Sequence, residues 1–243
     1  MCTVPTSVVA PAPSALPAPP AAPRRDAAAR SLDRHPPGTP PEVTIVIPTL
    51  DAAGDRLRRC VRAIQDHTDA PYEVVVVDNG APPQGFTAPV NAGLRAARGR
   101  YAVVCNDDVE VRPGWWPPLR TALDAGHPVA FPWTLDGPMR EDFAAWCFAV
   151  SRDALDRHAV APGEFLDPGL VVWYQDTDLL TRLRAAATPP VLVRESHVRH
   201  GLSETVATDD PTLRAWIDRQ VEDDRTAFEA RHGSQVPGAF VAG

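Results

Sequence analysis

The stretch that decides the fold reads Tyr101-Ala102-Val103-Val104-Cys105-Asn106-Asp107-Asp108. Five residues with the pattern of a buried strand bring two carboxylates to the strand's carboxyl end, which is where open α/β sheets bind their ligands. Adjacent anions repel each other unless a hard divalent cation, a hydrogen-bonded hydroxyl or a proton relieves them. The alternative is an ordinary polar turn after a strand, and the neighbouring sequence decides between the two.

The neighbouring sequence predicts a βαβ unit. Strands are expected over 43–49 and 73–78, and a second helix over 89–98 leads back into the sheet. The residues between the two strands have a helical apolar spacing, carried by Leu57, Cys60, Val61 and Ile64. Segment 73–78 is a β-branched run, typical of a parallel strand covered on both faces, and it also ends in an acid, Asp78. Both acidic strand ends are therefore expected to point into one crevice.

In this part of the sequence the chain resembles the family 2 glycosyltransferases, which are inverting enzymes of the GT-A fold that use nucleotide-sugar donors. The resemblance runs in the family's order through 43–49, 74–80, 91–99, 106–111, 113–115, 173–179 and 200–203. It implies a single α/β domain over residues 42–205, with a Rossmann-like, mostly parallel sheet flanked by helices.

The resemblance also implies roles for individual residues. Asp176 matches the general base, and Asp108 is the last acid of what looks like the family's DXD element. With His200, Asp108 would hold Mg²⁺ or Mn²⁺ against the donor's diphosphate, and His197 is a weaker competitor for that place. The donor and nucleotide side would comprise Pro48, Thr49, Asp78, Asn91 and Asp107, with Asp107 near the ribose. The acceptor side would comprise Trp173 and Gln175.

A helix is expected to begin near Asp176, and this bears on the roles of Asp176 and Asp178. A capping role for Asp176 is the structural alternative to general-base catalysis. Asp178, in the first turn, is expected to serve only the helix dipole. The resemblance implies a reaction that moves a sugar from a nucleotide-diphosphate donor to an acceptor hydroxyl with inversion. Inversion needs only one base, on the opposite side from the leaving group.

The sequence departs from the family pattern at two places. Only residues 81–84 separate Asn79-Gly80 from Gly85, where the family usually carries a further helix and strand, so the nucleotide-binding edge of the sheet should be shortened. This leaves the choice of nucleobase open. Gln175 stands where the family usually has an acid before the base.

These departures keep two other functions open. One is a sugar-nucleotide-binding protein with little catalysis. The other is a nucleotidyltransferase on a similar sheet, which is disfavoured because no Gly-rich phosphate loop bearing Arg or Lys follows the first strand.

Composition limits the partners and the compartment. The chain of 243 residues has a formal charge of −7 and a pI near 5.5, which argues against a nucleic-acid partner. No segment is long and apolar enough to span a membrane, and a cytoplasmic protein is expected. Cys60, Cys105 and Cys147 lie in apolar patterns, and Cys2 is near the start. We expect them to be free thiols because their spacing fits no metal site.

Both ends of the chain differ from its middle. Residues 1–41 contain 11 of the 28 prolines and are expected to form a disordered Pro/Ala-rich tail. Residues 206–243 are expected to contribute a C-terminal helix over 210–231 and a tail. The apolar stripe of that helix should pack on the domain, and a homodimer seam is the alternative. The expected partners are a nucleotide-sugar donor and a small-molecule or glycan acceptor.

Overall fold

The computed structural model describes residues 33–36, 38–79, 83–136, 142–200 and 210–233. Three parts of the sequence discussed above lie outside the described residues. They are 1–32, which include Cys2, the segment 80–82, and 201–203, the last stretch of the resemblance. The strands are β1 (Val43–Thr49), β2 (Tyr72–Asp78), β3 (Tyr101–Cys105), β4 (Val109–Val111), β5 (Val129–Thr134), β6 (Cys147–Ser151) and β7 (Val191–His200). The helices are α2 (Asp55–His67), α3 (Thr87–Ala96), α4 (Trp116–Asp124), α5 (Arg152–Arg157), α6 (Gln175–Ala185) and α7 (Pro211–His232).

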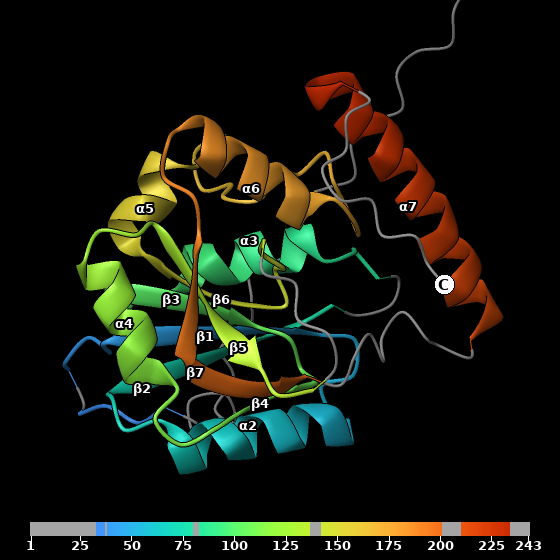
Figure 1. Ribbon diagram of the computed structural model, residues 1–243. Helices are drawn as coiled ribbons and strands as arrows, with labels where there is room; N and C mark the ends of the chain where they lie inside the picture. Colours follow the sequence, from blue (N-terminus) through green and yellow to red (C-terminus); the bar gives the residue numbers. More distant parts are fainter. Residues whose placement is uncertain (1–32, 37, 80–82, 137–141, 201–209, 234–243) are drawn as a thin grey trace, which may run out of the picture.

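The strands form one sheet in the order β2-β1-β3-β6-β5-β7-β4 (Figure 1). The expected parallel arrangement is found for β2, β1 and β3, where Thr49 pairs with Asp78 at the carboxyl ends of β1 and β2. The other half of the sheet contains both parallel and antiparallel pairs. β6 runs antiparallel to β3 and to β5, and β4 runs antiparallel to β7, whereas β7 is parallel to β5. The α/β class is confirmed, but the expectation of a mostly parallel sheet is wrong, because three of the six strand pairs are antiparallel.

Helices cover both faces of the sheet, as the β-branched strands predict. One face packs on α2 and α4 through Ile45, Ile47, Val103, Leu57, Ile64, Trp116 and Leu119. The other packs on α3, α5 and α6 through Val46, Val104, Val90, Leu94, Leu155, Leu179 and Leu183. Alternate residues of β1 and β3 therefore point into different cores, and the strand ends between the two layers remain available for a site.

The outer edge of the sheet is β2, in agreement with the predicted shortening. No strand lies outside it among the described residues. Instead Arg34 forms an antiparallel bridge with Tyr72, with N···O distances of 2.8 and 3.1 Å. Asp33 accepts a hydrogen bond from the backbone N–H of Val74 at 3.2 Å. Residues 33–36 of the expected tail are thus packed against the domain, and they satisfy backbone groups that an edge strand would otherwise expose.

Helix α7 lies along one side of the domain (red in Figure 1). It begins where the sequence predicted, because the Asp210 carboxylate caps it by accepting the N–H groups of Thr212 and Leu213. The helix packs on the domain through the buried Ile217 and Phe228. Of these two, Ile217 belongs to the predicted apolar stripe, so packing of the stripe on the domain is confirmed at that position. A dimer remains a prediction.

The cysteines of the core are buried free thiols, as expected for Cys60, Cys105 and Cys147. The sulfur atoms of Cys60 and Cys105 lie 3.9 Å apart, and their contact together with burial raises the pKa of the Cys60 thiol well above its usual range. Among the described residues, none of the helices is sufficiently long and apolar to cross a bilayer.

Candidate active site

A cavity of about 240 Å³ opens at the carboxyl ends of the central strands. This volume far exceeds the space of one ordered water, so it can hold an organic ligand. Seven parts of the chain line it: 48–50 after β1, residues between 79 and 86 after β2, 106–108 after β3, 144–146 before β6, 172–176 at the start of α6, His200 at the end of β7, and one face of α7. Most of the predicted site residues line it together, namely Pro48, Thr49, Asp107, Asp108, Trp173, Gln175, Asp176 and His200.

The donor side is organised by contacts between neighbouring strand ends. The Thr49 hydroxyl donates to the Asp107 carboxylate at 2.6 Å, which joins the ends of β1 and β3. Asn79, directly after β2, donates its backbone N–H to the carbonyl of Thr49 at 2.7 Å, and its side chain donates to the carbonyl of Gly85 at 2.6 Å. Asn79 lines the cavity, and the sequence analysis did not assign it a role. Its side chain also accepts the backbone N–H of Gln84, so Asn79 ties the end of β2 to residues 84 and 85.

Two predicted donor residues lie elsewhere. Asp78 is exposed at the end of β2 and is not part of the cavity lining. Asn91 is buried in α3, where its amide donates to Glu164 and to the carbonyl of Leu166 and accepts the N–H of Leu166. These bonds use the hydrogen-bonding capacity of Asn91 to hold segment 164–166, so its position supports a structural role.

The predicted metal ligands are brought together by strand pairing. β4 and β7 are antiparallel, with Val109 opposite His200. This pairing brings the end of β7 beside Asp108, which directly precedes Val109. The His200 Nε2 atom lies 3.4 Å from Asp108 Oδ1. The Trp146 ring stacks on the His200 ring with centroids 4.5 Å apart, which fixes the plane of the imidazole. His197 is exposed and does not line the cavity, because side chains alternate along β7.

Three buried oxygens in the cavity lining have no hydrogen-bond partner among the described residues: Asn106 Oδ1, Asp108 Oδ1 and Gln175 Oε1. A buried acceptor without a partner costs about 1–3 kcal/mol, so these positions favour a bound ligand or cation. Carboxylate and amide oxygens with one imidazole suit Mg²⁺ or Mn²⁺. The donor set therefore fits the predicted divalent cation.

Asp176 lies at the amino end of α6, where it lines the cavity. Its Oδ1 atom accepts the backbone N–H of Thr177 at 2.7 Å. Before the helix, Tyr174 has a φ of 65°, a left-handed conformation that is uncommon for a bulky residue and that other contacts must hold in place. One such contact is the stacking of the Tyr174 ring on Phe228 of α7, with centroids 5.3 Å apart.

The segment before Asp176 is held from two sides. On one side the Val171 carbonyl accepts the N–H groups of Phe86 and Thr87 at 2.7 and 3.2 Å. Gly85 makes this approach possible, because a Cβ atom there would lie 2.3 Å from the Val171 oxygen and its φ is +81°. On the other side α7 supplies the buried carboxylate of Asp224, which accepts the backbone N–H groups of Val171, Val172 and Trp173.

Asp178 has a different role from the one predicted. Its side chain is fully buried and pairs with Arg182 at 2.8 Å and with His232 at 2.8 Å. The expectation that Asp178 serves only the helix dipole is wrong, because its carboxylate connects α6 to the last residue of α7. A buried carboxylate requires such partners.

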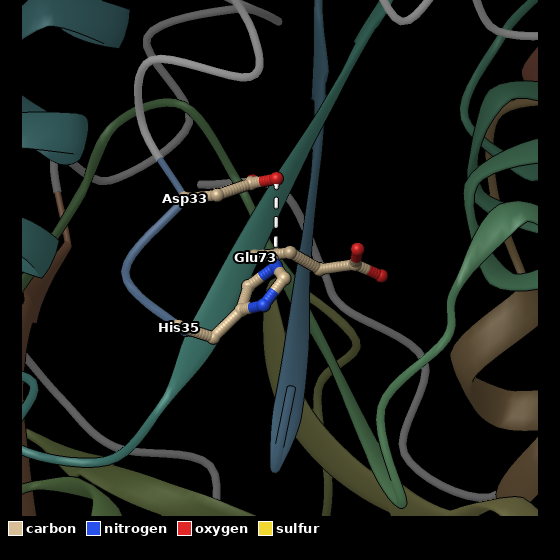
Figure 2. Close-up of side chains that lie close together, drawn as sticks. All are labelled: Asp33, His35 and Glu73. Carbon is tan, nitrogen blue, oxygen red and sulfur yellow. Dashed lines mark ion pairs between the residues drawn. The ribbon is translucent and has the colours of Figure 1, made fainter. Parts of the chain in front are cut away.

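A second acidic group lies away from this cavity, at the outer edge of the sheet. Figure 2 shows Asp33, His35 and Glu73, whose ligand atoms lie within 4.8 Å of one another. Glu73 already accepts hydrogen bonds from Thr44 and from the backbone and side chain of Arg98. The Arg98 guanidinium occupies the place of a cation in this group, so the cavity site is the better match for the donor's metal.

Comparisons with known proteins concern the family and the fold. Residues 82–151 match the model of glycosyl transferase family 2, a range that contains the Asp107-Asp108 element and β6. The structure is similar to one described as the crystal structure of GalNAc-T7 with UDP, GalNAc and Mn²⁺, at 15% identity and a TM-score of 0.53. That similarity covers 81% of this chain and 52% of the other, so the chain spans about half the length of that protein. The comparison with curated proteins gave no match.

The family match confirms the resemblance to the family 2 glycosyltransferases over residues 82–151. The structural match shows the GT-A-type fold. Asp176 and His200 lie outside the matched range, so their assignment depends on the cavity geometry.

Proposed function

We propose that the protein is an inverting glycosyltransferase that moves a sugar from a nucleotide-diphosphate donor to an acceptor hydroxyl. The observation that supports this most strongly is the convergence of Asp107, Asp108, His200 and Asp176 on one cavity, from β3, β7 and α6. This arrangement places groups suited to the donor and a group suited to the acceptor's proton within one space.

The donor side would be built from Pro48, Thr49 and Asp107, with Asp107 accepting a ribose hydroxyl. Asp108 and His200 would hold Mg²⁺ or Mn²⁺, which when bound stabilises the negative charge that develops on the departing diphosphate. The charge balance supports this assignment. No Lys or Arg is among the described residues lining the cavity, so these residues offer a diphosphate no Lys or Arg side chain to balance its charge.

In the proposed reaction Asp176 removes the proton from the acceptor hydroxyl. The hydroxyl oxygen forms a bond to the anomeric carbon while the bond between that carbon and the diphosphate oxygen breaks, and the nucleoside diphosphate leaves with the electron pair. Attack from the side opposite the leaving group inverts the anomeric carbon. The α6 N-terminus stabilises the ionised form of the Asp176 carboxylate through the helix dipole.

Gln175 would contribute without charge. Its Nε2 donates to the Val172 carbonyl at 3.1 Å, which directs the unpartnered Oε1 as an acceptor for a substrate hydroxyl. The acid usual at this position in the family would thereby be replaced by a neutral group that keeps one acceptor oxygen and adds a donor.

The test is a thermal-shift series with the diphosphates of uridine, thymidine, guanosine, cytidine and adenosine, each with and without Mn²⁺. A nucleotide at about 100 times its dissociation constant should stabilise the protein by roughly 2.7 kcal/mol. We expect one nucleotide to raise the melting temperature only when Mn²⁺ is present. Sugar release from the matching nucleotide sugar then distinguishes an enzyme from a binding protein, and no shift with any nucleotide would contradict the proposal.

A further inference from the structure

One part of the cavity lining, supplied by α7, is apolar. Leu213, Trp216 and Ile217 lie at helical spacing on one face of the first two turns of α7, and all three line the cavity. Ile217 is buried, whereas Leu213 and Trp216 are partly exposed. Trp173 belongs to the same lining and keeps 36% of its surface exposed, although it lies only three residues before the proposed base.

The charges at the cavity disfavour an anionic acceptor. The acidic side chains of its lining are Asp107, Asp108 and Asp176, and an anion beside Asp176 would meet a like charge. Among the described lining residues there is no Lys or Arg to compensate. His200, which lies beside Asp108, is on the donor side.

The polar groups of the lining are also unevenly distributed. The unpartnered oxygens of Asn106 and Gln175 are close to the reacting residues, whereas the α7 face presents only hydrocarbon and indole. On that face a polyhydroxylated acceptor would find only the indole N–H of Trp216 as a hydrogen-bond partner, so most of the hydroxyls buried there would lose hydrogen bonds, which costs free energy for each one. An acceptor with one hydroxyl directed at Asp176 and an apolar body would lose no such bonds.

We propose that the acceptor is an uncharged, hydroxyl-bearing molecule with a flat apolar ring body, bound between Trp173 and the α7 wall formed by Leu213, Trp216 and Ile217. This inference rests on the proposed function and names its acceptor class. Flat rings are favoured over flexible chains because indole side chains gain most from offset or edge contacts with other rings. The ring body excludes water from the cavity and directs its hydroxyl toward Asp176.

The test measures binding of four probes by calorimetry in the presence of Mn²⁺ and the nucleoside diphosphate selected above. 2-Naphthol represents the proposed class, 6-hydroxy-2-naphthoate adds a carboxylate to the same rings, methyl β-glucoside is polyhydroxylated, and 1-octanol is a flexible chain. We expect 2-naphthol to bind at least about 10-fold more tightly than each of the others. Equal or tighter binding of the naphthoate or the glucoside would overturn the proposal. Tighter binding of 1-octanol would overturn the claim that the acceptor has a flat ring body.

Variants locate the probe. Leu213→Ala and Trp216→Ala should each weaken 2-naphthol by about 10-fold, the loss expected when roughly 50 Å² of apolar contact is removed. Leu135→Ala is the matched control, because Leu135 is 51% exposed and does not line the cavity. The nucleotide-dependent thermal shift of each variant reports whether it is folded. If the nucleotide binds and 2-naphthol does not, the acceptor inference fails alone; if 2-naphthol binds and no nucleotide does, the proposed function fails.

Discussion

The carboxylate of Asp224 in α7 accepts the backbone N–H of Trp173 at 2.7 Å, three residues before the proposed base. The same side chain accepts the N–H groups of Val171 and Val172 at 2.8 and 2.7 Å and is only 1% exposed. Three charge-assisted hydrogen bonds from consecutive residues define the path of the chain there. The C-terminal helix is therefore a structural support of the acceptor side of the cavity.

Asp224→Asn should impair turnover more than donor binding. The amide keeps one acceptor oxygen and brings an NH₂ group against backbone donors, so the segment should shift and carry Asp176 with it. A shift of about 1 Å at a reacting group can cost roughly 100-fold in rate. We expect kcat to fall by about 10–100-fold while the nucleotide-dependent thermal shift is kept. Asp223→Asn, at an exposed position of α7, is the control, and equal kcat values for the two variants would contradict the role of Asp224.

Removal of the proposed metal ligand should abolish both transfer and metal-dependent nucleotide binding. Asp108→Asn loses the charge that the cation requires, and EDTA should have the same effect on the wild-type protein. His200→Ala should reduce the Mn²⁺-dependent thermal shift with the nucleotide, whereas His197→Ala, on the exposed side of β7, should leave that shift unchanged. Full transfer activity in EDTA would exclude the metal assignment.

The alkaline limit of stability should depend on Tyr101. Burial, together with the hydrogen bond that its hydroxyl donates to Asp124, raises the pKa of Tyr101 to about 12. The phenol ionises near pH 10 in an unfolded chain, so its stabilising contribution is complete below about pH 10 and is lost as the pH rises toward 12. Tyr101→Phe should lower stability at pH 7 by about 1 kcal/mol but flatten its decline between about pH 10 and 12. Urea denaturation across that range would measure both effects, and an unchanged slope would contradict this assignment.

The residues before β1 should contribute to stability from Asp33 onward. Deletion of residues 1–40 removes the two backbone hydrogen bonds of Arg34 with Tyr72 and the bond from Val74 to Asp33, whereas deletion of 1–32 leaves them in place. We expect the longer deletion to cost about 1–3 kcal/mol more in unfolding free energy. Identical denaturation midpoints for the two deletions would show that these contacts add no stability.

The sequence predicted the elements whose patterns are local. The β-branched runs of β1 and β2 and the helical spacing of Leu57 to Ile64 identify their elements directly, and Asp210 marks the start of α7. The acidic residues that follow β3, Asp107 and Asp108, predicted the site at this edge of the sheet because they directly follow a recognisable strand pattern. Asn91 lies outside the cavity lining, and a position carried over from a resemblance does not reveal that its amide bonds to segment 164–166.

Other parts of the site could not be read in this way. β7 carries a period-two signal, with Ser196, Val198 and His200 buried and the residues between them exposed, but its charged residues mask the strand pattern. Asp224 is invisible in the sequence because its partners are backbone N–H groups. The stacking of Trp146 on His200 depends on the pairing of β4 with β7, which the order of elements does not determine.

The sharpest test of the reaction compares Asp176 and Asp178, two carboxylates in the first turn of α6. Asp176 lines the cavity, whereas Asp178 is fully buried between Arg182 and His232. Asp176 is not the helix cap, because α6 begins at Gln175 after the N-cap Tyr174. Asn keeps an oxygen that can accept the N–H of Thr177 but cannot act as a base, so Asp176→Asn should keep the melting temperature and reduce kcat by roughly 10²–10⁴. Asp178→Asn should instead destabilise the protein by about 3–5 kcal/mol, because it leaves Arg182 without its buried partner. Measured where both variants are folded, a larger loss of kcat in Asp178→Asn than in Asp176→Asn would move the base away from Asp176.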